Sequence, residues 1–189
     1  MIIGIKEEDK VLLAYSAFDM RIPTTVDDMT SSENTCVWKI TRTPHTVMGC
    51  GICTAEYDAF RYEERLFRGE ISVERLLDDI IPAMENYAKD KEYIGDGKGR
   101  FEEFLIAQRG RLFRITDEHT VEEVDSYTVI GGSEEEHAKG ALYATAELPA
   151  LDRIRKVFEF ISARIQATAY PISVIDTKTG KLQILTAGN

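Results

Sequence analysis

Hydrophobic and polar positions along the chain follow the periods of strands and helices. Residues 2–5 and 11–14 are two short apolar runs separated by a charged turn. This pattern is typical of a β-hairpin that is buried on both faces. Residues 17–35 are polar and irregular, which predicts a surface loop. Because chain ends stay loose unless a sheet holds them, the hairpin predicts an amino end fixed in the protein core.

The strand pattern continues through residues 37–40 and 46–53, and a helical period follows from Ala55. Apolar side chains then recur every three or four positions until Gly69, which ends the first helix. Ser72 precedes a second apolar stripe and has the character of a helix N-cap. Pro82 lies inside this stripe, so we expect a kink or a break there.

The second half of the chain repeats this order of strands and helices. Strands are expected at residues 104–108, 111–115, 126–130, 172–175 and 182–185, and helices at residues 134–148 and 151–165. Pairs of helices inserted into an antiparallel strand system predict an α+β fold, in which two packed sheets carry a helix pair on each outer face. No linker divides the chain, so we expect a single domain over residues 1–189.

Composition excludes several classes of partner. The chain has 189 residues, a formal net charge of -10 and a pI of about 4.9. A basic face is required to bind a phosphate backbone, so nucleic acid and anionic membranes are not expected partners. The sequence shows neither a membrane-spanning run nor a signal-peptide pattern, which favours a cytoplasmic protein. Its three cysteines are more typical of thiols or metal ligands than of a disulfide framework.

Several stretches together resemble a known family. They are residues 3–5 with 11–14, 38–40, 50–52, 104–107 with 110–115, and 127–133 before the helix at 138–144. In their order and spacing the chain is similar to a proteasome β-subunit or to the related bacterial peptidase HslV. The resemblance implies the Ntn-hydrolase fold, a four-layer αββα sandwich of two antiparallel sheets. It also implies a homo-oligomer, either a ring or a dimer, with a peptide or protein as a further partner.

The same resemblance assigns roles at the amino end. Active members of the family use a threonine directly before the first strand, and its own α-amino group acts as the base. Aligning Gly4 with the family glycine places that threonine one residue before Met1, and Met1 itself brings only an inert thioether to the nucleophile position. The family lysine, whose positive charge lowers the pKa of the nucleophile, falls on Lys39. The family acid falls on Ser16, or near Asp19 if the loop shifts.

Two further family positions fall later in the chain. The family serine falls on Gly131 or on Ser133, and the late aspartate falls within residues 166–170, which contain no carboxylate. The resemblance therefore implies a structural or binding homologue that keeps the fold without its peptidase chemistry. The alternative is an active peptidase with a processed or displaced nucleophile. Thr24 and Thr25 look like a mature threonine-peptidase start, but the residues after them lack a strand pattern and favour an exposed loop.

A second constellation lies at residues 36–53. Cys36, His45, Cys50 and Cys53 provide three thiolates and an imidazole, which would suit a tetrahedral Zn²⁺ site and a small zinc-stabilised binding module. The other interpretation is that the cysteines are ordinary core residues, so that no cofactor is present. If the family alignment holds, Gly51 lines a vestigial substrate pocket bordered by Cys50 or Cys53. A Cys nucleophile acting with His45 is a further alternative.

The remaining ionisable groups predict no chemistry. His119 is expected in a turn between strands and His137 on an acidic helix, both in contact with solvent. The adjacent carboxylates Asp78 and Asp79 are expected on a polar helix face, where they favour solubility over acid–base catalysis.

Overall fold

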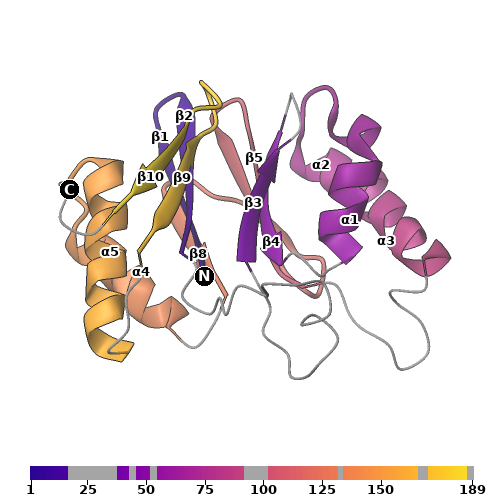
Figure 1. Ribbon diagram of the computed structural model, residues 1–189. Coiled ribbons are helices and arrows are strands. Elements are labelled where there is room, and N and C mark those ends of the chain that lie inside the picture. The colour runs from indigo at the N-terminus through magenta and orange to yellow at the C-terminus, as the bar shows by residue number, and fades with distance from the viewer. Residues whose placement is uncertain are drawn as a thin grey trace.

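The computed structural model describes residues 1–16, 38–42, 46–51, 55–91, 102–131, 134–165 and 170–186, and Figure 1 shows how their elements are arranged. Residues 38–42, 51, 55, 61 and 165 are described by their backbone alone.

The first sheet, here called sheet I, contains both ends of the described chain. Its strands are β1 (Ile2–Glu7), β2 (Lys10–Ser16), β8 (Tyr127–Ile130), β9 (Ile172–Asp176) and β10 (Leu182–Leu185). They lie in the order β10-β9-β2-β1-β8, and every neighbouring pair is antiparallel. The predicted amino-terminal hairpin and the two predicted carboxy-terminal strands are therefore confirmed, and the carboxy-terminal strands form a second hairpin beside the first.

The second sheet, here called sheet II, is built from the middle of the chain. Its strands are β3 (Trp38–Arg42), β4 (Val47–Gly51), β5 (Phe104–Gln108), β6 (Arg111–Ile115) and β7 (Val121–Glu123), in that order and all antiparallel. Arg109 and Gly110 join β5 to β6 with φ values of 51° and 75°. A turn with positive φ at both central residues matches the twist of the strands. The strands predicted at residues 104–108 and 111–115 are confirmed, and this turn joins them as a tight hairpin.

The first helix layer forms two helical stretches. The first is α1 (Ala55–Tyr62) followed by the 3-10 turn η2 (Glu64–Phe67). The second runs without a break through α2 (Val73–Arg75), the π-helical turn η3 (Leu76–Ile80) and α3 (Ile81–Asp90). Ser72 caps it as predicted, because its hydroxyl accepts a hydrogen bond from the Arg75 backbone N–H at 3.2 Å. The helix accommodates Pro82 with the π turn directly before it and does not break there.

The second helix layer consists of α4 (Glu135–Ala144) and α5 (Ala150–Ile165). Pro149 separates them, as the sequence indicates, but α4 ends at Ala144, earlier than the predicted end at Leu148. Arg153 of α5 donates a hydrogen bond to the Leu142 carbonyl oxygen at 2.9 Å, which satisfies one of the last carbonyls of α4. None of the helices in the described ranges is long and apolar enough to cross a membrane.

Three apolar clusters hold the four layers together. One contains Phe158 and lies between sheet I and helices α4 and α5. Another contains Phe60 and lies between sheet II and helices α1 to α3. The third lies between the two sheets, where Leu13 of sheet I and Leu105 of sheet II are fully buried. The order of the layers is helix, sheet, sheet, helix (Figure 1), which confirms the α+β sandwich expected from the sequence.

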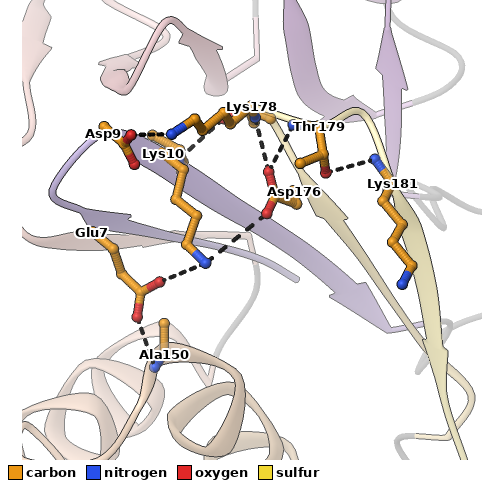
Figure 2. Close-up of polar contacts among 10 residues, drawn as sticks. Glu7, Asp9, Lys10, Ala150, Asp176, Lys178, Thr179 and Lys181 are labelled. Atoms are coloured by element: carbon orange, nitrogen blue, oxygen red, sulfur yellow. Dashed lines mark hydrogen bonds and ion pairs between the residues drawn. The ribbon is translucent and has the colours of Figure 1, made fainter.

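Polar contacts fasten the two hairpin turns of sheet I to each other (Figure 2). The Lys10 ammonium lies 3.1 Å from the Glu7 carboxylate and 4.0 Å from that of Asp176, and Lys178 pairs with Asp9. Glu7 also accepts a hydrogen bond from the Ala150 backbone N–H at 3.2 Å, at the start of α5. These contacts join the β1–β2 turn, the β9–β10 turn and the second helix layer at one end of the sandwich.

Candidate functional site

The amino end of the chain lies at the opposite end of β1 from these turns. Met1 is 7% exposed, and with Ile3 and Ile5 it belongs to the cluster beneath helices α4 and α5. Ile2 belongs to the cluster between the sheets. Successive side chains of a strand point to opposite faces, and β1 follows this rule from its first residue. The Met1 thioether is therefore buried on the helix side, away from the interface between the sheets.

Ile2 fills the inter-sheet face at this end. A Cβ placed on Gly49 of β4 would lie 3.0 Å from both the Cδ1 and the Cγ2 of Ile2. The side chain of Ile2 thus rests directly on the backbone of the facing strand. Because Ile2 is fully buried, the inter-sheet space beside the first residues is packed with aliphatic groups.

Lys39 lies in β3 as its second residue, where its Cα pairs with that of Cys50 in β4. Trp38 is paired in the same way with Gly51, the last residue of β4. Cys50 is buried in the cluster between sheet II and its helices. The structure therefore brings Lys39, Cys50 and Gly51 together at one end of the β3–β4 pair, as backbone positions. The predicted pocket role of Gly51 stays a prediction.

Ser16, which the resemblance predicts at the family acid position, ends β2 and is 4% exposed. Its Cα pairs with that of Ile172 in β9. A hydroxyl at this buried position brings no charge toward the amino end. The predicted roles of Ser133, Asp19, Thr24 and Thr25 concern residues outside the described ranges.

The same is true of most of the predicted zinc ligands. Cys36, His45 and Cys53 lie outside the described residues, and Cys50 alone is placed. Within the described ranges, no group of three or more His, Cys, Asp or Glu side chains is arranged to hold a metal ion. The zinc site therefore stays a prediction.

One charged cluster was not identified from the sequence. Arg114 of β6 pairs with Glu103 before β5 and with Glu135 in the first turn of α4, the latter at 2.9 Å. Lys139 adds a second contact to Glu135 at 2.7 Å. Burial opposes the charge of Arg114, but the hydrogen bond that Arg114 donates to Glu103 and the charges of the two carboxylates raise the pKa of Arg114. The cluster ties sheet II to the second helix layer.

The sequence signal for this cluster was weak. Arg114 lies within residues 111–115, for which the sequence predicts a strand and nothing about charge. Leu112 of the same strand packs between the sheets, so the alternation of β6 places Arg114 on that inner face as well. An arginine at an inward position of a strand needs carboxylate partners. The alternation of β6 therefore predicts that acidic side chains from other segments lie close to Arg114.

His119 also differs from expectation. It lies in the turn between β6 and β7, but its ring is half-buried against α3, where Nδ1 is 2.9 Å from a carboxylate oxygen of Glu85. His137 of α4 lies 3.3 Å from Glu134 and keeps more exposure. Asp78 and Asp79 are exposed on η3, as predicted.

Comparisons with known proteins were made by sequence and by structure. No family model and no curated protein matches the sequence. Among solved structures, BPH of Thiobacillus denitrificans is similar over 98% of this chain and 98% of its own, with 17% identity and a TM-score of 0.62. The Anbu protein (ancestral β-subunit) of Yersinia bercovieri matches 99% of this chain and 87% of its own, with 12% identity and a TM-score of 0.60.

A third structure extends the comparison. Eukaryotic HslV from Trypanosoma brucei covers 93% of this chain and 97% of its own, with 17% identity and a TM-score of 0.51. The Thiobacillus protein has also been solved in complex with epoxomicin. With two antiparallel sheets enclosed by two helix layers, the chain has the Ntn-hydrolase fold of the proteasome-like proteins.

Proposed function

We propose that this chain is a single-domain, proteasome-like protein of the cytoplasm that lacks peptidase activity and acts as a structural or binding subunit of a homo-oligomer. The observation that carries the proposal is the placement of the first two side chains. Met1 is buried beneath the helices, and Ile2 is buried between the sheets against Gly49.

This placement leaves no group at the described amino end that could act as an amino-terminal nucleophile. Such a mechanism needs a hydroxyl or thiol beside the α-amino group, and both must reach a substrate carbonyl. Residues 1–5 are Met, Ile, Ile, Gly and Ile, so neither face of this strand end carries a hydroxyl or thiol. Both faces are instead occupied by tightly packed aliphatic or thioether groups, whose burial stabilises the sandwich.

The neighbouring position supports the same conclusion. Ser16 is buried at the end of β2 and supplies no negative charge to orient an amine. Lys39 is proposed as a remnant of the family lysine. Without a nucleophile to activate, a lysine at this place would serve structure or ligand binding.

Assembly is proposed from the similar structures. The Yersinia protein is described as an ancestral β-subunit, a term for one member of an assembly. The present chain is similar to that protein over 99% of its length, which supports the proposal that it assembles as well. We propose a homo-oligomer and leave its geometry to measurement.

The loss of peptidase activity can be tested with epoxomicin, the compound found in complex with the Thiobacillus protein. The purified full chain is incubated with epoxomicin and its intact mass is recorded, with the Thiobacillus protein as the positive control. We expect an unmodified mass for this chain and no release of a fluorophore from peptide substrates.

The opposite results identify the alternative. A mass increase equal to one epoxomicin, localised to a single residue by peptide mapping, would show an active peptidase with a displaced nucleophile. A shortened chain that begins at Thr24 or Thr25 would show a nucleophile created by processing. Either result contradicts the proposal.

A further inference from the structure

The strand β10 is an edge of sheet I with unusual exposure. Three edge strands have described side chains: β7, β8 and β10. The side chains of Thr128, Val129 and Ile130 in β8 are buried. The short strand β7 carries Glu122 and Glu123, and charged, short edges resist pairing with other chains. In β10, by contrast, Leu182 is 58% exposed and Ile184 is 51% exposed.

These two aliphatic side chains lie on the same face of the sheet. Leu182 is paired with Ile175 of β9, and Ile184 is paired with Ser173. Directly opposed residues of an antiparallel pair share a face, and Ile175 belongs to the cluster between the sheets. The exposure of Leu182 and Ile184 shows that sheet II does not cover β10, so the inner face of sheet I continues into solvent there.

The sequence of β10 is suited to pairing with itself. In an antiparallel pair centred on Gln183, Leu182 of each copy lies opposite Ile184 of the other. Both apolar contacts fall on the same face, and Lys181 lies opposite Leu185, so no like charges meet. A shift by one residue would join the inner face of one sheet to the outer face of the other, so Leu182 and Ile184 of the two copies would no longer lie on one continuous face.

We propose that β10 pairs with β10 of a second copy of this chain, joining two five-stranded sheets across a two-fold axis. The inference rests on the proposed self-assembly and names a surface for it. Four residues from each copy form a small interface, so the association is weak and depends on concentration. Because the chain carries a net charge of -10, salt screens the repulsion between copies and strengthens the pairing.

Cysteine cross-linking tests the register directly. In the proposed pair Gln183 lies opposite its own copy, so the variant Gln183→Cys brings two thiols together. The control Thr179→Cys lies four residues from the centre in each copy, which separates its thiols by roughly 20 Å or more at ~3.3 Å per residue. The full-length variants are oxidised at several protein and salt concentrations, and linked peptides are identified by mass spectrometry.

We expect at least about tenfold more disulfide linkage between copies of Gln183→Cys than between copies of Thr179→Cys, rising with salt. Adding Ile184→Lys to Gln183→Cys is expected to lower the yield by about tenfold, since both apolar contacts are lost. Leu77→Lys, a change at an exposed leucine of η3, is expected to leave the yield unchanged. Circular dichroism confirms that each variant is folded.

Equal yields of disulfide-linked dimer for Gln183→Cys and Thr179→Cys would overturn the β10 pair. A dimer yield that Ile184→Lys does not alter would overturn it as well. In either case a strand from a different protein would be the remaining partner for this edge. Light scattering on the unmodified chain separates this failure from that of the proposed function. An oligomer that persists without β10 linkage contradicts the β10 pair alone, whereas a monomer at every concentration contradicts both.

Discussion

Ile2 of β1 packs against Gly49 of β4, and the two residues define how closely the sheets approach beside the amino end. The Cδ1 and Cγ2 atoms of Ile2 lie 3.0 Å from the place where a Cβ on residue 49 would stand. A side chain at residue 49 and a branched side chain at residue 2 therefore compete for one space. The amino end of β1 is therefore held by packing between the two sheets.

Gly49→Ala is expected to destabilise the protein by about 1–3 kcal/mol, because the added methyl overpacks a closed core. Urea unfolding followed by circular dichroism measures the change. Combining it with Ile2→Ala tests the cause: alanine removes both the Cδ1 and the Cγ2 atoms, so the cost of Gly49→Ala should fall in that background. Equal costs in both backgrounds would show that the two residues do not compete.

Gly140→Ala provides a matched control, for which we expect a gain in stability where Gly49→Ala gives a loss. Gly140 lies inside α4, and no atom lies within 4 Å of a Cβ built on it. Alanine in a helix interior is favoured over glycine by roughly 0.5–1 kcal/mol, so this variant is expected to unfold at a higher urea concentration. A destabilised Gly140→Ala would show that α4 is constrained by contacts that its packing does not reveal.

Most of the fold could be predicted because its elements have local signals. The β1–β2 hairpin follows from two apolar runs around a charged turn, and the helix before Pro82 follows from Ser72 and its apolar stripe. The strand β7 lacks such a signal, because Val121, Glu122 and Glu123 form a strand only by pairing with β6. Its formation depends on tertiary contacts that local periodicity does not record.

The candidate site was less predictable than the fold. The apolar runs predicted a buried amino end, but only the structure shows that Met1 faces the helices and Ile2 faces the second sheet. Arg114 was missed because its partners Glu103 and Glu135 come from two other segments of the chain. Ion pairs between distant segments follow from the topology, which a single sequence does not specify.

Arg114→Leu is expected to destabilise the protein by about 2–4 kcal/mol, since it leaves the largely buried Glu103 without the Arg114 charge and Glu135 with Lys139 alone. The measurement is the free energy of unfolding at neutral pH. Lys156→Ala serves as the control, because its pair with Glu159 is solvent-exposed and worth less than ~1 kcal/mol. Similar costs for the two variants would show that the Arg114 cluster contributes no more than a surface pair.

Gln108→Met is expected to cost about 1–3 kcal/mol, because it removes buried hydrogen bonds at the end of β5. The Gln108 side-chain oxygen accepts from the Ile71 backbone N–H at 2.9 Å, and its amide donates to Thr46 Oγ1 at 2.9 Å. Thr46→Val should cost less, since the Gln108 amide also donates to the Phe67 carbonyl at 3.3 Å. Thermal unfolding of both variants checks this order, and a larger cost for Thr46→Val would contradict it.

Glu123 of β7 is expected to make stability depend on pH. Arg111 donates two hydrogen bonds to its carboxylate, at 2.8 and 2.6 Å, and these hold the pKa of Glu123 below its ordinary value of 4.5. A carboxylate whose pKa is lower in the folded state stabilises the fold above the unfolded pKa. That contribution is lost as the pH falls through the folded pKa.

The free energy of unfolding of Glu123→Gln should therefore be lower than that of the unmodified chain at neutral pH, and the two values should approach each other in acid. Because the pair is about one-third exposed, the difference at pH 7 is expected to be no more than about 1 kcal/mol. At about pH 3, below the ordinary pKa of 4.5, the difference should be smaller, since the unfolded chain is then mostly protonated at residue 123. Glu122→Gln removes the same charge from an exposed neighbouring residue and controls for net charge. If urea unfolding gave the same Glu123→Gln difference at both pH values, the Arg111 pair would not be the source of the pH dependence.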